Sequence, residues 1–110
     1  MRVKKLGSRK DKGAEMPKGY VISRVDIKDP DAYAKYATAS SEAIRAHGGK
    51  PLARGGRFEA LEGPARQRNV VIEFESFDKA REYYHSALYQ AAKALREGAA
   101  EMEIVAVEGV

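Results

Sequence analysis

The chain of 110 residues contains no cysteine and no tryptophan, and it has only two histidines and four prolines. Without cysteine, the protein can form neither a disulfide nor a thiolate nucleophile nor a cysteine–zinc site. Two histidines are too few for a typical zinc set, and no carboxylate spacing indicates another metal. We therefore expect neither a bound metal nor a cofactor.

Long hydrophobic runs are absent as well. No stretch approaches the ~18 apolar residues that a membrane-spanning helix needs. The residues that follow Met1 do not include the apolar segment that a secretory signal requires. Hydrophobic residues make up 44% of the chain and charged residues 33%, which is typical of a globular domain. We expect a single cytoplasmic domain that does not contact the membrane.

The net charge of +4 is confined to one end of the chain. Residues 1–15 hold six basic and two acidic side chains, whereas the remaining 95 residues hold 14 of each sign. The first segment has few apolar residues, which predicts a disordered basic tail. It is either a basic arm that touches RNA or an anionic surface or, as we favour, extra N-terminal residues without a role. Residues 16–110 are predicted to form the domain, and their balanced charge does not favour nucleic-acid binding.

Alternating apolar residues predict the strands of this domain. The pattern covers residues 20–27, 69–75 and 101–107, with β-branched residues prominent in the first two. Residues 51–61 are predicted to form a further strand, interrupted at Gly55-Gly56. Paired glycines inside a strand indicate a bulge, or a place where a ligand or another backbone comes close.

Two helices are predicted between these strands. Asp29-Pro30 is typical of a helix start, and Gly48-Gly49 would end a helix over residues 30–47. Ser76 is predicted to cap the second helix. Ser86 is a second cap within it, so we expect a kink or a restart before Ala87.

The element order is therefore β-α-β-β-α-β, which predicts an α+β ferredoxin-like sandwich: a four-stranded antiparallel sheet with both helices on one face. The opposite face carries Tyr20, Ile22 and Val71 beside Arg24 and Glu73. This face has too many apolar residues to be fully exposed to water and too many charged residues to form the core of a monomer. We expect a homodimer that pairs these sheet faces and encloses a cavity lined by the charges.

Three charged residues, Arg24, Arg54 and Glu73, are the predicted ligand-binding site. Arg24 and Glu73 lie on central neighbouring strands and face away from the helices, where a carboxylate beside a guanidinium can bind a small anion or act as a base. Arg54, beside the glycine pair, can present a bidentate fork to a carboxylate. The competing interpretation is a structural salt bridge in the dimer interface. No catalytic residue is predicted.

Several segments together carry a resemblance to a known family. They are MPKGY (residues 16–20), ARGGRF (53–58), VVIEF (70–74), YQAAKAL (89–95) and VEGV (107–110). Over residues 16–110 the chain resembles the bacterial domain-of-unknown-function 1330 family. The resemblance implies a ferredoxin-like fold within the dimeric α/β-barrel superfamily, whose members pair sheet to sheet. It implies no settled activity.

Two functions remain as hypotheses. The first is a small dimeric protein that binds a polar or aromatic metabolite in a cavity at the sheet face. Because relatives in the superfamily include cofactor-free monooxygenases, this hypothesis extends to cofactor-free chemistry by analogy of fold. The alternative is a non-catalytic interaction or accessory homodimer, which the absence of any recognisable catalytic motif favours.

Overall fold

A computed structural model of the chain describes residues 16–110. Its elements, in chain order, are β1 (Gly19–Ile27), α1 (Pro30–Ala46), β2 (Lys50–Arg54), β3 (Arg68–Phe74), α2 (Phe77–His85), α3 (Ala87–Leu95) and β4 (Ala100–Glu108). The predicted tail, residues 1–15, lies outside the described residues. No helix within the described part is long and apolar enough to cross a membrane.

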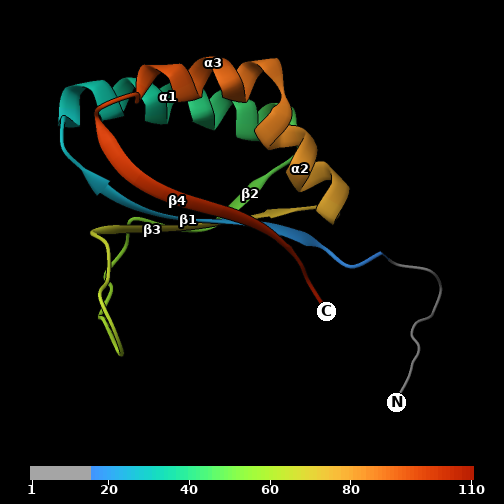
Figure 1. The fold of residues 1–110 in the computed structure, drawn as a ribbon. Helices are drawn as coiled ribbons and strands as arrows, with labels where there is room; N and C mark the ends of the chain where they lie inside the picture. Colours follow the sequence, from blue (N-terminus) through green and yellow to red (C-terminus); the bar gives the residue numbers. More distant parts are fainter. Residues whose placement is uncertain (1–15) are drawn as a thin grey trace.

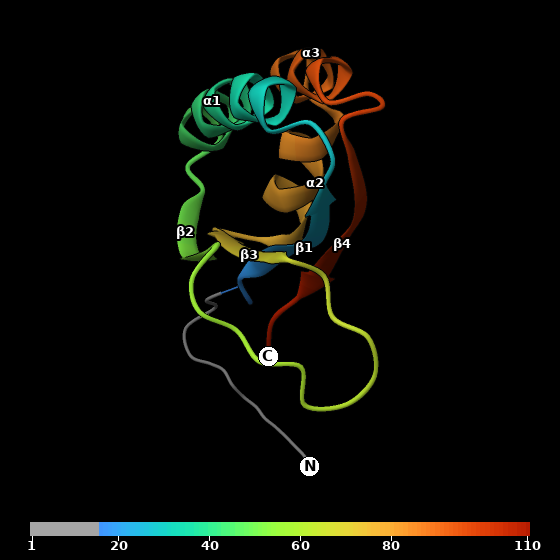
Figure 2. The same cartoon turned by 90° about the vertical axis from the view of Figure 1, so that its left-hand side faces the viewer.

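The four strands form one sheet in the order β2-β3-β1-β4, and every neighbouring pair is antiparallel. β1 and β3 are therefore the central neighbours, as predicted. All three helices cover the same face of the sheet, which the two views in Figures 1 and 2 show. We call this the inner face and the opposite one the outer face. The predicted ferredoxin-like sandwich is confirmed.

Side-chain caps set the helix ends where the sequence predicts them. The Asp29 carboxylate accepts the backbone N–H groups of Asp31 and Ala32, and α1 ends at Ala46. Ser86 divides the second helical region in two. Its hydroxyl donates to the Tyr83 carbonyl at 2.7 Å and accepts the Tyr89 N–H at 3.1 Å. The predicted restart before Ala87 is confirmed.

The second strand is shorter than predicted. It ends at Arg54, and residues 55–67 leave the sheet as a loop on the outer side (Figure 1). Gly55 has a φ of +72° and donates its N–H to the Asn69 carbonyl at 3.1 Å, which directs the chain out of the sheet. The glycine pair thus marks the end of a strand, and the register shift lies earlier, between Pro51 and Ala53.

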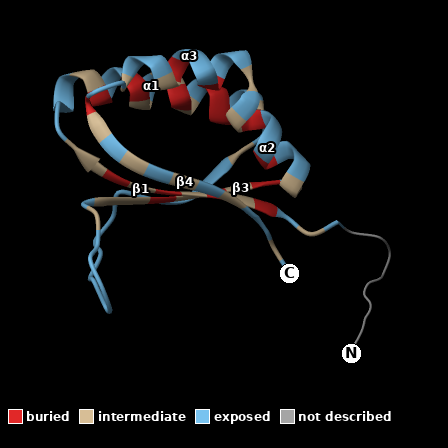
Figure 3. Ribbon diagram, in the orientation of Figure 1, coloured by how far each residue is buried: buried red, intermediate tan, exposed pale blue. Residues whose placement is uncertain are grey.

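The core lies between the inner face and the helices (Figure 3). Val21 and Val25 of β1 are buried there, together with Val70, Ile72 and Phe74 of β3, as the alternation predicts. Two serines are buried among these apolar residues: Ser23 is 4% exposed and Ser40 is 7% exposed. Polar groups at core positions require an explanation, and both serines line a pocket.

Candidate functional site

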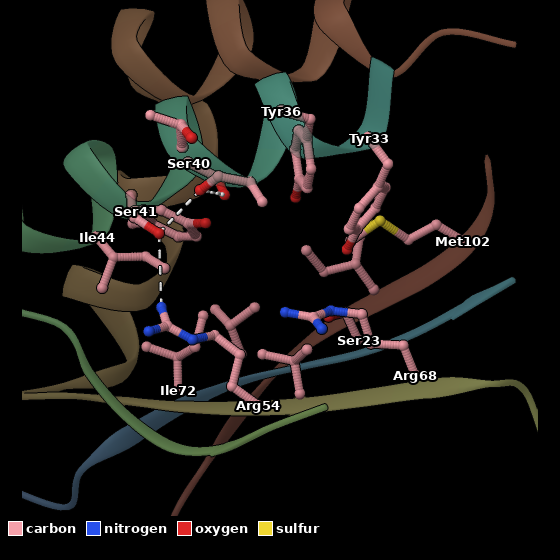
Figure 4. A pocket seen from close by; sticks show the side chains of 16 residues that line it. Ser23, Tyr33, Tyr36, Ser40, Ser41, Ile44, Arg54, Arg68, Ile72 and Met102 are labelled. Carbon is pink, nitrogen blue, oxygen red and sulfur yellow. Dashed lines mark hydrogen bonds between the residues drawn. The ribbon is translucent and has the colours of Figure 1, made fainter. Parts of the chain in front are cut away.

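A pocket of about 280 Å³ lies between α1 and the inner face of the sheet. Figure 4 shows residues from the helix pointing down into it and residues from the strands pointing up. Its polar lining residues are Ser23, Tyr33, Tyr36, Thr38, Ser40, Ser41, Arg54, Arg68 and Tyr83. Its apolar lining residues are Val21, Ala37, Ile44, Val70, Ile72, Met102 and Ile104.

Two arginines rise from the sheet into this pocket (Figure 4). Arg54 of β2 lies opposite Val70 of β3, so its side chain shares the inner face with that buried residue. Arg68 precedes Val70 by two residues on the same strand and therefore faces the same side. Diagonal neighbours of this kind lie about 7–8 Å apart. Both guanidinium groups line the same pocket.

Arg68 is held by the residues around it. Its guanidinium carbon lies 5.8 Å from the centroid of the Tyr33 ring, within the range of a cation–π contact. A Cβ atom at Gly55 would overlap the same guanidinium, so the glycine gives Arg68 room to reach the pocket. The Nε of Arg68 is buried and has no hydrogen-bond partner in the structure of residues 16–110.

Arg54 is attached more loosely. Its Nη1 lies 3.5 Å from the Ser41 hydroxyl of α1, the limit of a hydrogen bond (Figure 4). Within residues 16–110, neither Arg54 nor Arg68 forms a salt bridge with a carboxylate. Both charges therefore lack a fixed counter-charge in this part of the chain.

Tyr36 at the roof of the pocket belongs to a buried chain of polar groups. Its hydroxyl lies 2.9 Å from the Tyr89 hydroxyl, and Nη2 of Arg96 donates to the Tyr89 oxygen at 3.3 Å. The Arg96 guanidinium also lies 5.2 Å from the centroid of the Tyr36 ring. These contacts with Tyr89 and Arg96 fix the orientation of the Tyr36 side chain.

The tyrosine hydroxyls of the pocket are hydrogen-bond donors rather than bases. Burial raises the pKa of Tyr33, Tyr36 and Tyr83 above the ordinary value of 10.0, although the positive charge of Arg68 opposes this at Tyr33. All three hydroxyls stay protonated at neutral pH. Among the described residues that line the pocket there is no Asp, Glu, His or Lys. The lining therefore supplies positive charge and hydrogen-bond donors, but no carboxylate, imidazole or amine that could accept a proton from a ligand.

The predicted trio of Arg24, Arg54 and Glu73 does not come together in this structure. Arg24 and Glu73 share the outer face, but Glu73 lies opposite Tyr20 and Arg24 lies opposite Asn69. Four residues along a strand separate these positions by about 13 Å. Arg54 is on the other side of the sheet, in the pocket.

Arg24 and Glu73 have other partners. Glu73 accepts a hydrogen bond from the Tyr20 hydroxyl at 3.0 Å. Arg24 donates to the Pro64 carbonyl at 3.0 Å and lies 4.0 Å from Glu103. A ligand role for these two residues stays a prediction.

The outer face has its own charge cluster around Arg66, at the end of the loop of residues 55–67. The Arg66 guanidinium lies 2.9 Å from Asp26, 3.3 Å from Glu103 and 3.5 Å from Glu101. Its hydrogen bond to Glu103 lowers the pKa of that carboxyl. These contacts attach the loop to β1 and β4.

Sequence reasoning missed Arg68 and Ser23 as site residues. The signal was present in the alternation: Arg68 has the same parity as Val70, Ile72 and Phe74, and Ser23 lies between Val21 and Val25. A charged and a polar residue on core-facing positions indicate a cavity beneath them. The sequence does not show how far α1 stands from the sheet, so the pocket itself was not predictable.

Metal binding has no support in the geometry of residues 16–110. This part of the chain contains no group of three or more His, Cys, Asp or Glu side chains that is placed to hold an ion. A second hollow, of about 410 Å³, lies between α2 and β4 and is lined by Phe77, Arg81 and His85 among others. Arg81 and His85 are exposed there. The pocket under α1 is the stronger candidate because its polar lining includes buried groups.

The sheet order and the helices on one face define a ferredoxin-like α+β domain with a pocket between its layers. Residues 18–110 match the model of the family described as "Domain of unknown function (DUF1330)", so the chain belongs to this family. No curated protein matches the chain significantly.

Solved structures share this fold at low sequence identity. A protein of unknown function from Rhodopseudomonas palustris is 19% identical, with a TM-score of 0.69 over 86% of this chain and 83% of that one. A dimeric ferredoxin-like protein of unknown function from Thermobifida fusca is also 19% identical, with a TM-score of 0.59 over 86% of this chain and 92% of that one. SnoaB, a cofactor-independent oxygenase from Streptomyces nogalater, is 10% identical, with a TM-score of 0.59 over 83% and 91%.

Proposed function

We propose that this protein binds a small organic molecule in the pocket between α1 and the inner face of the sheet. The observation that carries the proposal is the presence of polar side chains on core-facing positions of the strands: Ser23, which is buried, and Arg68, which is half-buried. Ser40 on the helix also lines the pocket, but its hydroxyl already donates to the Ala37 carbonyl at 3.3 Å. Burying polar groups destabilises a fold unless they find partners. A ligand with matching polar atoms supplies those partners.

The size and composition of the pocket limit the ligand. A volume of about 280 Å³ lies just below the ~300–1,000 Å³ that is common for ligand sites. A single-ring compound fits this space better than a fused-ring one. Cofactor-free catalysis belongs to the proposal only by analogy with the oxygenase that shares the fold. The lining favours binding, because it contains no side chain suited to take a proton.

Methyl NMR spectroscopy tests the proposal. The isoleucine methyl groups of residues 16–110 would be observed while neutral and charged single-ring compounds are added. Ile44, Ile72 and Ile104 line the pocket and should shift, whereas Ile22 on the outer face serves as the control. If no compound shifts the pocket methyls, or if Ile22 moves as much as they do, the proposed site is wrong.

The outer face supports a second proposal, that the chain forms a homodimer through this face. Ile22 lies between Val71 and Val105 in the register of the sheet, and Val107 is next to Tyr20. Val105 is 55% exposed and Val107 is 44% exposed. Such a patch on one face of a sheet is typical of an interaction surface. Neighbours from Thermobifida fusca and Bacteroides fragilis are described as dimeric, which supports a second copy as the partner.

A charge placed in this patch should separate the two copies. We expect light scattering to give about twice the chain mass of 12.1 kDa for the parent, and a single chain mass for Val105→Glu, because a carboxylate cannot be buried without a partner. Leu88→Glu is the matched control, because Leu88 is 49% exposed but lies on α3. A monomeric parent, or a Val105→Glu variant that remains dimeric, would overturn the proposal.

A further inference from the structure

We infer that the pocket under α1 is a site for a small organic carboxylate with an apolar body. The inference rests on the proposed function, because it names the chemical class of the ligand for the same site. Three properties of the pocket carry it: the sign of its charge, the direction of its hydrogen-bond donors, and the apolar surface beside them.

The charge of the pocket is positive. Arg54 and Arg68 enter it from neighbouring strands, and none of the described lining residues is acidic. The half-buried guanidinium of Arg68 has no opposite charge in the described structure, which is unfavourable, so an anion beside it stabilises it. The exposed Arg54 adds a second positive charge next to the same anion. The planar fork of a guanidinium matches the two oxygens of a carboxylate.

The hydroxyl groups around the arginines donate as well. Arginine can only donate, so the Tyr89 oxygen must accept from Arg96. Tyr36 and Tyr89 share a hydrogen bond of 2.9 Å in which either hydroxyl can donate. When Tyr89 donates to Tyr36, the proton of Tyr36 is left for an acceptor in the pocket. A carboxylate supplies only acceptors, which suits this arrangement.

The rest of the lining is apolar and selects the body of the ligand. Ile44 covers the pocket from the helix, while Ile72 and Ile104 cover it from the sheet. An inorganic anion such as phosphate has no surface to place against these side chains. A carboxylate on a single ring or on a short branched chain fills both halves of the pocket and keeps within its volume of about 280 Å³.

Benzoate and benzamide form a matched pair of probes, because they differ in charge but hardly in shape. Titrations of the full chain, followed by the methyl signals of Ile72 and Ile104, would use both probes and inorganic phosphate. We expect benzoate to bind at least about tenfold more tightly than benzamide, since a charge-assisted hydrogen bond contributes that much. We expect phosphate to leave both methyl signals in place.

Two variants assign the effect to the arginines. Arg68→Gln and Arg54→Gln should each weaken benzoate about tenfold and leave benzamide unchanged. Arg45→Gln is the control, because Arg45 is an exposed residue of α1 outside the pocket. Arg54 is exposed on the edge strand, so its variant keeps the test valid if Arg68→Gln does not fold.

The outcomes separate this inference from the proposed function. If benzamide or another neutral compound binds in the pocket as tightly as benzoate, the carboxylate is wrong but the pocket remains a binding site. The same conclusion follows if both arginine variants bind benzoate as the parent does, or if phosphate alone moves the methyl signals. If no charged or neutral compound shifts the pocket methyls, both proposals fail.

Discussion

Tyrosine hydroxyls beneath α1 link the pocket to the stability of the fold. Tyr83 is 2% exposed, and its hydroxyl makes no hydrogen bond within residues 16–110. Burial raises its pKa above 10.0, because the phenolate would lose its hydration there. The unfolded chain has no such restriction, so its tyrosines ionise at their ordinary pKa. The folded state then binds more protons than the unfolded state above about pH 10.

The ionisation of Tyr83 should therefore leave the free energy of unfolding unchanged below pH 10. Above pH 10 the free energy of unfolding should fall as the pH rises. Each tyrosine that stays protonated contributes a slope of roughly 1.4 kcal/mol per pH unit. Tyr83→Phe should remove one such contribution and make the decline shallower. Urea denaturation between pH 8 and pH 11.5 measures both slopes. Equal slopes for parent and variant would mean that Tyr83 ionises as easily when folded as when unfolded.

At the scale of elements, Ser86 separates two helices that would otherwise be one. The same hydroxyl ends α2 through the Tyr83 carbonyl and begins α3 through the Tyr89 N–H. Tyr83 and Tyr89, which it positions, pack with ring centroids 4.9 Å apart in the core. The cap at Ser86 therefore sets the direction from which the side chains of Tyr83 and Tyr89 enter the core.

Loss of this cap should destabilise the domain. Ser86→Ala removes both the acceptor for the Tyr89 N–H and the donor to the Tyr83 carbonyl, which should lower the free energy of unfolding by about 1 kcal/mol or more. Ser86→Thr keeps both groups and should stay within a few tenths of a kcal/mol of the parent. Urea denaturation compares the two variants. A Ser86→Ala variant as stable as the parent would show that the helix break is held by packing instead.

Elements were predictable where a local signal defines them, and less so elsewhere. Asp29, Ser76 and Ser86 act on backbone groups within three residues, so their sequence context suffices to place helix ends. The end of β2 at Arg54 depends on the conformation of Gly55 and its hydrogen bond to Asn69, which no local pattern specifies. The predicted strand therefore extended too far.

At the scale of the whole molecule, the topology was predictable and the site only in part. Alternation gives the face on which Arg24 and Glu73 lie, but the register that sets them four residues apart arises from pairing distant segments. The same applies to Arg54, whose face is fixed by its place opposite Val70. The pocket depends on the height of α1 above the sheet, and α1 packs mainly against α3, which is distant in the sequence.

The two proposed binding surfaces lie on opposite faces of the sheet. The pocket opens on the inner face, whereas the apolar patch around Val105 lies on the outer face. A ligand under α1 and a second copy on the outer face would not compete for the same surface. If the proposed dimer separates in the Val105→Glu variant as expected, that variant allows the proposed ligand binding to be tested on the monomer.

The pairing of β1 with β4 has a consequence for synthesis of the protein. Gly19 lies opposite Glu108, and the Gly109 N–H donates to the Lys18 carbonyl at 2.7 Å, so the two ends of the domain meet in neighbouring strands. During translation, β1 lacks its β4 neighbour until residues 100–108 have left the ribosome. The sheet is therefore completed only after nearly the whole domain has been made, and until then one edge of its central strand is exposed to other nascent chains.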